Sequence, residues 1–230
     1  MLIMKKIFIH IALFLFFSTN LNAHISHYKN FKKIEMEIFR NNELIGYNYY
    51  FFKTKNDEVQ VTIQTKITVK LLGTTIFDIE GYGEEKYKND KLISFHSKTK
   101  QNKKEKFVNL EINTENNKFT IQGSSYSGEA NKDNIIGNWW NHKLLQAESQ
   151  ISPVSGSIKE QVITFIAKEK IELYGKDYET EHFKLKSKNQ KLPDDKKLNF
   201  DIWLDKSTGL IIKVKYSRMG EWEYRLKSFE

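Results

Sequence analysis

The amino-acid sequence predicts an all-β protein: a curved antiparallel sheet that closes into a barrel or half-barrel, with one short helical insertion near residues 135–148. Three observations lead to this prediction. Apolar and polar side chains alternate with a period of two along most of the chain, as in strands with one buried and one exposed face. Short stretches of Asn, Asp and Gly separate these runs and favour hairpins between antiparallel neighbours. Aromatic residues make up 13% of the 230 residues, a supply that favours strands and large cores.

The clearest alternation covers residues 59–71. Its odd positions hold Val, Ile, Leu and one Thr, whereas its even positions hold only Gln, Thr and Lys. The same pattern predicts strands over 32–40, 44–54, 58–71, 75–88, 91–101, 104–113, 118–123, 159–168, 170–174, 177–187, 197–205, 209–217 and 221–229. Several of these segments are longer than an ordinary strand, and long one-sided strands curl into barrels because their twist accumulates and their edges seek closure.

Residues 124–157 are the one long break between hairpins. The segment begins with Gly, Ser and Asn and then contains Trp140, Leu144 and Leu145, which fit one face of a short helix. A break of this length inside a barrel is usually functional or packed as a plug. We expect it to lie over one mouth of the barrel as a lid, within a single domain over 24–230.

The N-terminal residues 1–23 have the pattern of a secretory signal peptide. Lys5 and Lys6 precede an apolar run over 7–17, and a polar stretch then ends at Ala23. The apolar run is too short for a comfortable membrane span. We therefore expect cleavage after Ala23 and a soluble protein of the bacterial periplasm without a stable membrane span. An uncleaved N-terminal anchor is the alternative.

The charge and the absence of cysteine exclude several classes of protein. The formal net charge is +8, but only Arg40, Arg218 and Arg225 are arginine among the 37 basic residues. Arginine is the preferred group for bidentate phosphate and base contacts. The lysines are dispersed along alternating segments, so we expect a solvated surface and no nucleic-acid partner. Without cysteine the chain has no disulfide, no zinc–thiolate site and no thiol nucleophile.

The sequence contains no motif for a catalytic, metal or cofactor site. It lacks a phosphate-binding glycine loop, a nucleophile elbow, a zinc-binding H-E-x-x-H and a calcium loop. We therefore expect no enzyme, no cofactor and no metal site. His142, beside two tryptophans, is the histidine that could act as a base. His96, His182 and the acidic pairs Glu84-Glu85 and Asp194-Asp195 are interpreted as solvated.

The candidate ligand-binding residues combine the aromatic segment over 47–52 with the insertion. They are Tyr49, Phe51, Trp139, Trp140, His142 and Leu144. The aromatic segment is apolar on both faces of its predicted strand. Either the insertion covers its outer side or the strand lines a cavity, and both interpretations stay open.

Three stretches carry a resemblance to a known family. They are the hairpin over 39–49 with Leu44-Ile45-Gly46, the motif Trp140-Asn141-His142 followed by Leu144-Leu145, and Asp201-Ile202-Trp203-Leu204-Asp205 followed by Gly209-Leu210. Together they resemble a family of exported proteobacterial proteins of unknown function. The last stretch is also similar to the closing hairpin of periplasmic lipoprotein carriers, half-barrels that bind acyl chains. The resemblance implies a curved antiparallel sheet in the periplasm and no particular activity.

Three functional hypotheses follow, and the interior of the barrel distinguishes them. A binding protein for a hydrophobic or amphipathic ligand, such as a lipid or acyl chain, needs a cavity. A non-catalytic envelope structural or interaction protein needs only a filled core. An enzyme needs a polar pocket around His142 and a carboxylate. The aromatic content and the long insertion favour the first hypothesis.

Overall fold

The computed structural model describes residues 26–230, so the expected signal peptide lies outside the described residues. Strands form one 15-stranded sheet in the order β8-β7-β6-β5-β4-β3-β2-β1-β15-β14-β13-β12-β11-β10-β9. All neighbours pair antiparallel except β9 and β10, which are parallel.

The elements are η1 (Ser26–Asn30), β1 (Lys33–Arg40), β2 (Glu43–Lys55), β3 (Glu58–Leu71), β4 (Thr74–Lys88), β5 (Lys91–Gln101), β6 (Lys104–Asn113), β7 (Lys118–Gly123), β8 (Ser127–Asn131), β9 (Ile135–Ile136), η2 (His142–Leu145), β10 (Ser149–Ile151), β11 (Ile158–Leu173), β12 (Lys176–Ser187), β13 (Asn199–Asp205), β14 (Ile211–Ser217) and β15 (Glu221–Phe229).

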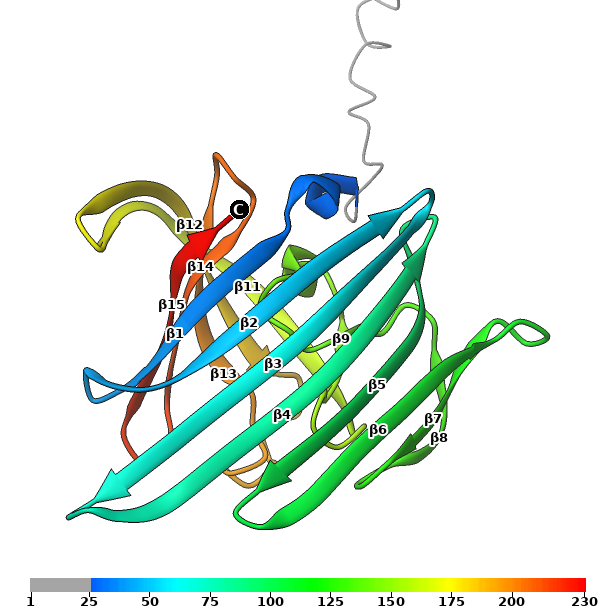
Figure 1. Cartoon of the computed structure of the whole chain (residues 1–230), viewed down its shortest axis with the longest axis horizontal. Coiled ribbons are helices and arrows are strands. Elements are labelled where there is room, and N and C mark those ends of the chain that lie inside the picture. The colour runs from blue at the N-terminus through cyan, green and yellow to red at the C-terminus, as the bar shows by residue number, and fades with distance from the viewer. Residues whose placement is uncertain (1–25) are drawn as a thin grey trace, which may run out of the picture.

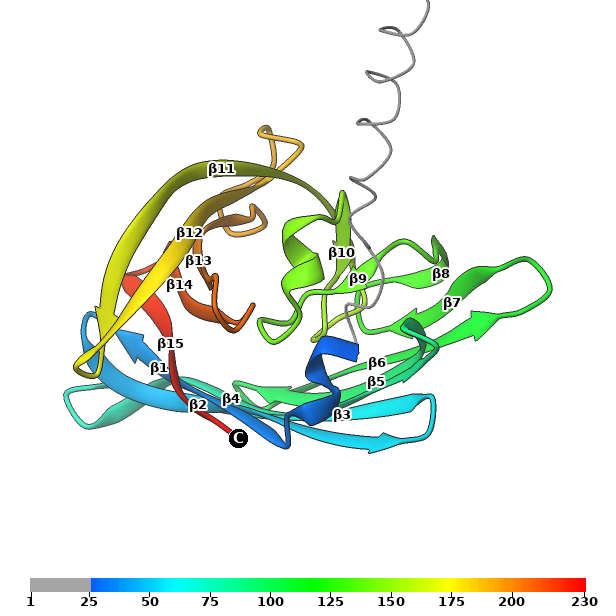
Figure 2. The ribbon, with the colours of Figure 1, turned by 90° about the horizontal axis from the view of Figure 1, so that it is seen from above.

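The sheet curls strongly but does not close into a barrel (Figure 1). β1 pairs with β15, so the first and last strands lie side by side in the middle of the sheet. The two edges are β8 and β9, which follow each other along the chain. Figure 2 shows that β9, β10 and η2 lie inside the curve of the sheet. The chain turns inward at this point instead of pairing the two edges, and the result is an incomplete barrel.

The predicted fold class is confirmed, and most predicted strands are observed close to their expected bounds. The segments 159–168 and 170–174 merge into the single strand β11, whose pairing with β12 shifts between Phe165 and Ala167. The expected helix near 135–148 is one short 3-10 turn, η2. The sequence did not predict β8, β9 and β10, because these strands are short and lack a two-residue alternation.

Asparagine determines the geometry of several hairpins. Asn41 and Asn42 connect β1 to β2 with φ of 50° and 66°, and Asn89 and Asp90 connect β4 to β5 with φ of 49° and 62°. Two successive residues with positive φ form the turn whose twist matches the flanking strands. Asn and Asp tolerate this conformation better than other residues with a side chain. The expected turns at these positions are confirmed.

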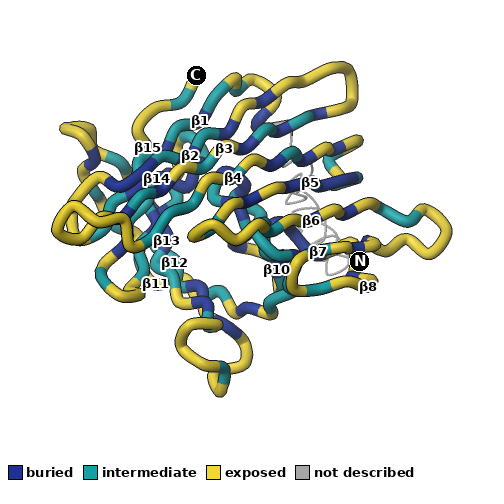
Figure 3. Tube along the Cα trace, turned by 60° about the horizontal axis from the view of Figure 1, so that its bottom comes forward, coloured by how far each residue is buried: buried dark blue, intermediate teal, exposed yellow. Residues whose placement is uncertain are grey.

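Buried and exposed residues alternate along the long strands, as Figure 3 shows by colour. In β3, Val61 and Ile67 are buried on the concave face, whereas Gln64 and Lys66 are exposed on the outer face. The predicted phase of this strand is therefore confirmed. The concave face carries the main hydrophobic core, and the outer face remains available to solvent.

Gly46 allows β2 and β3 to approach each other closely. A Cβ atom at this position would lie 2.0 Å from the carbonyl oxygen of Lys66 and 2.9 Å from the Cα of Ile67. We expect Gly46→Ala to lower the free energy of unfolding by roughly 1–3 kcal/mol, because the backbone must move to relieve the clash. Gly81→Ala in β4 is the control, since its Cβ would meet no atom closer than 3.4 Å. Equal urea denaturation midpoints for the two variants would contradict this explanation.

Candidate binding cavity inside the curved sheet

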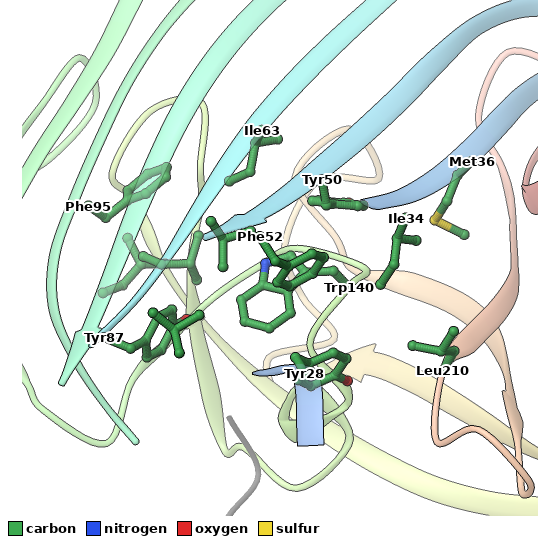
Figure 4. Packing of buried hydrophobic residues seen from close by; sticks show 14 of the residues in the cluster. Tyr28, Ile34, Met36, Tyr50, Phe52, Ile63, Tyr87, Phe95, Trp140 and Leu210 are labelled. Atoms are coloured by element: carbon green, nitrogen blue, oxygen red, sulfur yellow. The ribbon is translucent and has the colours of Figure 1, made fainter. Parts of the chain in front are cut away.

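The insertion over 124–157 fills one end of the curved sheet. Trp140 is 1% exposed and makes edge-to-face contacts with Tyr28, Phe52 and Tyr87, with ring centroids 4.9, 5.4 and 5.8 Å apart. Figure 4 shows these rings gathered around the Trp140 indole. Leu144 is fully buried in a second core cluster. The expected lid is therefore a plug, because its apolar side chains extend the core rather than cover an empty mouth.

A buried carboxylate anchors this plug to β4. The Glu85 carboxylate accepts hydrogen bonds from Trp140 Nε1 at 3.1 Å, from the Asn138 side-chain amide and from the Tyr87 hydroxyl. Glu85 is 1% exposed, and burial raises the pKa of its carboxyl to about 7, although the three donors favour the ionised form. The three donors satisfy a group that would otherwise destabilise the core.

The interpretation of Glu84-Glu85 as a solvated pair was wrong for Glu85. Glu84 points outward and forms an ion pair with Lys86 at 3.1 Å, whereas Glu85 points inward. The pairing of β4 with β3 indicates that Glu85 is buried. Glu85 pairs with Val61, which belongs to the buried phase of β3, and residues opposite each other share a face.

The short helix η1 closes the plugged end of the sheet from the N-terminal side. Its residue Tyr28 is fully buried, and burial raises the pKa of the Tyr28 hydroxyl. That hydroxyl lies 2.7 Å from His142 Nδ1 and accepts a hydrogen bond from the His142 backbone N–H at 3.2 Å. His142 therefore helps to join the plug to η1.

A cavity of about 280 Å³ remains between the plug and the opposite end of the sheet. One wall comes from β2 to β5, another from β13 to β15, and the plug closes it on a third side. The apolar lining residues include Ile63, Ile67, Phe95, Val154 and Phe200. The interior is thus neither wholly empty nor wholly filled.

Aromatic hydroxyls and amides supply a polar side to this cavity. Tyr224 accepts hydrogen bonds from the Tyr216 hydroxyl and the Trp139 indole, and burial raises the pKa of Tyr224 to about 12 despite these donors. On the facing wall, Thr65 donates to the Asn48 side-chain oxygen at 2.8 Å. These groups already form hydrogen bonds with one another, but their hydroxyls can also form hydrogen bonds with a ligand that enters the cavity.

Positive charge lies at the end of the cavity away from η1. Arg218 lines the cavity next to Tyr216 and follows β14 at the hairpin to β15. Lys159 lies within electrostatic reach, and its pKa is lowered first by burial and then by the charge of Arg218. The positive charge of Arg218 at the cavity wall favours an anionic group there.

Of the six candidate ligand-binding residues, only Trp139 lines the cavity. Trp140 and Leu144 belong to the packed core, and His142 contacts η1. Tyr49 and Phe51 point to the outer face, because neighbouring residues of a strand alternate between faces and Tyr50 and Phe52 are the buried pair. The expectation of one site made of all six residues was wrong.

His182 is less solvated than the sequence suggested. Its ring stacks on Trp203 with centroids 4.4 Å apart and lies within 2.9 Å of Glu169 and 3.0 Å of Asp201. His96, by contrast, has a largely open side chain near Glu111. Within residues 26–230, no three His, Asp or Glu side chains are arranged to hold a metal ion. No helix in that part of the chain is long and apolar enough to cross a membrane.

Comparison with known proteins shows the family. The family described as Domain of unknown function (DUF6134) matches residues 36–227. The chain belongs to this family. The DUF6134 match extends from β1 to β15 and includes the plug and every wall of the cavity. It confirms the expectation of a family of unknown function, but it does not address export or the likeness to lipoprotein carriers.

A solved structure shares the fold of this DUF6134 protein. It is the crystal structure of a beta-barrel-like protein of Domain of Unknown Function DUF1849 from Brucella abortus. The two align with a TM-score of 0.56 and 8% sequence identity over 86% of this chain and 95% of the other. At this identity the likeness concerns the fold alone. No curated protein matches the chain.

Proposed function

We propose that this protein is a non-catalytic binding protein of the bacterial periplasm, which holds a small amphipathic molecule in the interior cavity. The observation that carries the proposal is the cavity of about 280 Å³, with aromatic and aliphatic walls and a polar side. Ligand sites are typically concave, mostly apolar and supplied with a few polar groups. The signal pattern over residues 1–23 supports export.

The size of the cavity restricts the ligand. Pockets for small molecules usually measure roughly 300–1,000 Å³. A cavity of about 280 Å³ lies just below this range, so it fits a short acyl chain or a single ring system, and not a complete phospholipid. Arg218 at the cavity wall favours a ligand with a carboxylate or phosphate head. A medium-chain fatty acid such as octanoate combines both properties.

The filled end of the sheet favours a second function. Trp140, Tyr28 and Phe52 form a close-packed core that leaves no space for a ligand beside the plug. A protein of this kind could serve as an envelope structural or interaction protein, with the cavity as a packing defect. Ligand binding distinguishes the two functions.

The proposal predicts that octanoate quenches or shifts the fluorescence of Trp139, because this indole lines the cavity. Thr65→Phe should abolish the response by filling the space, whereas Thr62→Phe on the outer face of the same strand should leave it unchanged. Arg218→Gln should weaken octanoate binding tenfold or more, since hydrogen bonds to charged groups contribute roughly 1.5–3 kcal/mol. Binding of octanol should not depend on Arg218.

Calorimetric titration with octanoate and octanol measures these affinities. If the wild-type protein binds neither compound, nor a fluorescent fatty-acid analogue, the binding function is wrong and the structural function gains support. If Thr65→Phe binds octanoate as tightly as the wild type, the ligand occupies another site.

A further inference from the structure

A line of side chains crosses the outer face of the sheet from β2 to β6. Strand pairing places Tyr49 opposite Gln64, Gln64 opposite Tyr82, Tyr82 opposite Lys98 and Lys98 opposite Phe107. Side chains in direct register point to the same face. These five residues, termed the outer row, therefore alternate aromatic and polar groups across five strands. Of these five residues, Tyr82 also borders the interior cavity, whereas the other four line only the outer hollow.

The aromatic rings of the outer row are accessible and regularly spaced. Tyr82 and Phe107 are 51% and 44% exposed. Because neighbouring strands lie about 4.8 Å apart, rings on every second strand are separated by about 9.6 Å. Tyr47 and Phe51 stack on either side of Tyr49 along β2, with centroids 6.0 and 6.1 Å apart. A hollow of about 760 Å³ lies over the row.

The charged side chains around these rings carry a net positive charge. The hollow is lined by four lysines and two glutamates: Lys66, Lys98, Lys100, Lys106, Glu80 and Glu105. No ion pair within residues 26–230 involves Lys66, Lys98 or Lys100. Their ammonium groups are available to an anion. The surface therefore offers separate flat apolar rings with cations between and beside them.

We propose that the outer row binds a linear anionic polysaccharide. Sugar rings present apolar C–H faces that pack on Tyr49, Tyr82 and Phe107, while their hydroxyl and amide groups bond the Gln64 amide. Carboxylates along the polymer pair with the lysines. Exposed aromatic patches rimmed by polar groups are characteristic of interaction surfaces. The alternating row matches a polymer that offers an apolar face and a charge at regular intervals.

Two other classes of macromolecule fit this surface less well. The centre of a protein interface is depleted in Lys and Glu, yet Lys98 lies between two rings of the row. Single-stranded nucleic acid carries a phosphate on every nucleotide and is commonly held by arginine as well as aromatic rings. The hollow has no arginine and contains Glu80 and Glu105, which repel so dense a charge.

Affinity electrophoresis of the purified protein tests the proposal with hyaluronate, which carries a carboxylate on every second sugar. Hyaluronate should retard the wild type, and Tyr82→Ala should lower the affinity about tenfold or more by removing the central ring. Lys98→Gln should weaken hyaluronate binding but leave binding of neutral chitin oligosaccharides unchanged. Ile166→Ala is the matched control, since this residue of β11 is also 51% exposed and lies outside the row.

Thermal melts verify that each variant is folded. The proposal is overturned if neither hyaluronate nor chitin oligosaccharides retard the wild type, or if Tyr82→Ala binds as the wild type does. It is also overturned if oligothymidylate retards the protein while the polysaccharides do not, because the row would then be a nucleic-acid surface. Octanoate binding is measured on the same variants, so failure here and failure of the interior site remain distinguishable.

Discussion

Trp140→Ala should lower the free energy of unfolding by roughly 3–5 kcal/mol, the cost expected for truncating a large buried aromatic residue. The substitution removes the ring that Tyr28, Phe52 and Tyr87 surround. It also deprives the Glu85 carboxylate of its indole donor. A buried acceptor that loses a partner adds to the cost of the cavity, because its desolvation is no longer compensated.

Tyr82→Ala provides the control for this measurement. Tyr82 is also an aromatic residue on the sheet, but it is half-exposed on the outer face. Its truncation should cost less than about 1 kcal/mol. Urea denaturation gives both values. A Trp140→Ala variant with wild-type stability would show that the insertion is a separable lid, as the sequence suggested, and not part of the core.

The stability of the protein should fall as the pH rises from 5 to 8, because of Glu85. Its carboxyl has a pKa of about 7 in the folded chain and an ordinary value near 4.5 when solvated. Between these values the folded state holds a proton that the unfolded state has released, so rising pH favours unfolding. The loss amounts to about 3 kcal/mol and is complete above pH 7, where both states are ionised. In a chain of this size this corresponds to a fall in Tm of about 6–12 °C.

Glu85→Gln removes the titrating group while retaining an oxygen for Asn138 and Trp140. Its Tm should vary much less between pH 5 and 8 than that of the wild type. Glu84→Gln, one residue away on the outer face, should leave the wild-type slope intact. Parallel curves for wild type and Glu85→Gln, measured by differential scanning calorimetry, would exclude Glu85 as the source of the pH dependence.

The interior cavity and the outer row use opposite faces of the same strands. Thr65 borders both hollows, but Ile63 lines only the interior cavity and its neighbour Gln64 lines only the outer hollow. Substitutions one residue apart can therefore test one surface while leaving the other in place. This arrangement lets a single protein carry two independent binding properties.

Local patterns were sufficient to predict the architecture. The alternation over residues 59–71 determines which side chains of β3 face inward, since a strand repeats every two residues. Asn41 and Asn42 determine a tight antiparallel turn through their tolerance of positive φ. These properties depend on residues adjacent in the chain and can be read without knowledge of the rest of the fold.

The site depended on contacts between distant segments. Glu85 resembles a surface carboxylate until Asn138 and Trp140, more than fifty residues later in the chain, supply its hydrogen bonds. The residues of the outer row lie side by side only because of the register of five strands, since Tyr49 and Phe107 are far apart in sequence. Whether the insertion covers the sheet or fills it is decided by the shape of the concave face. Packing and register join groups that no local pattern relates, so these features emerged only from the tertiary structure.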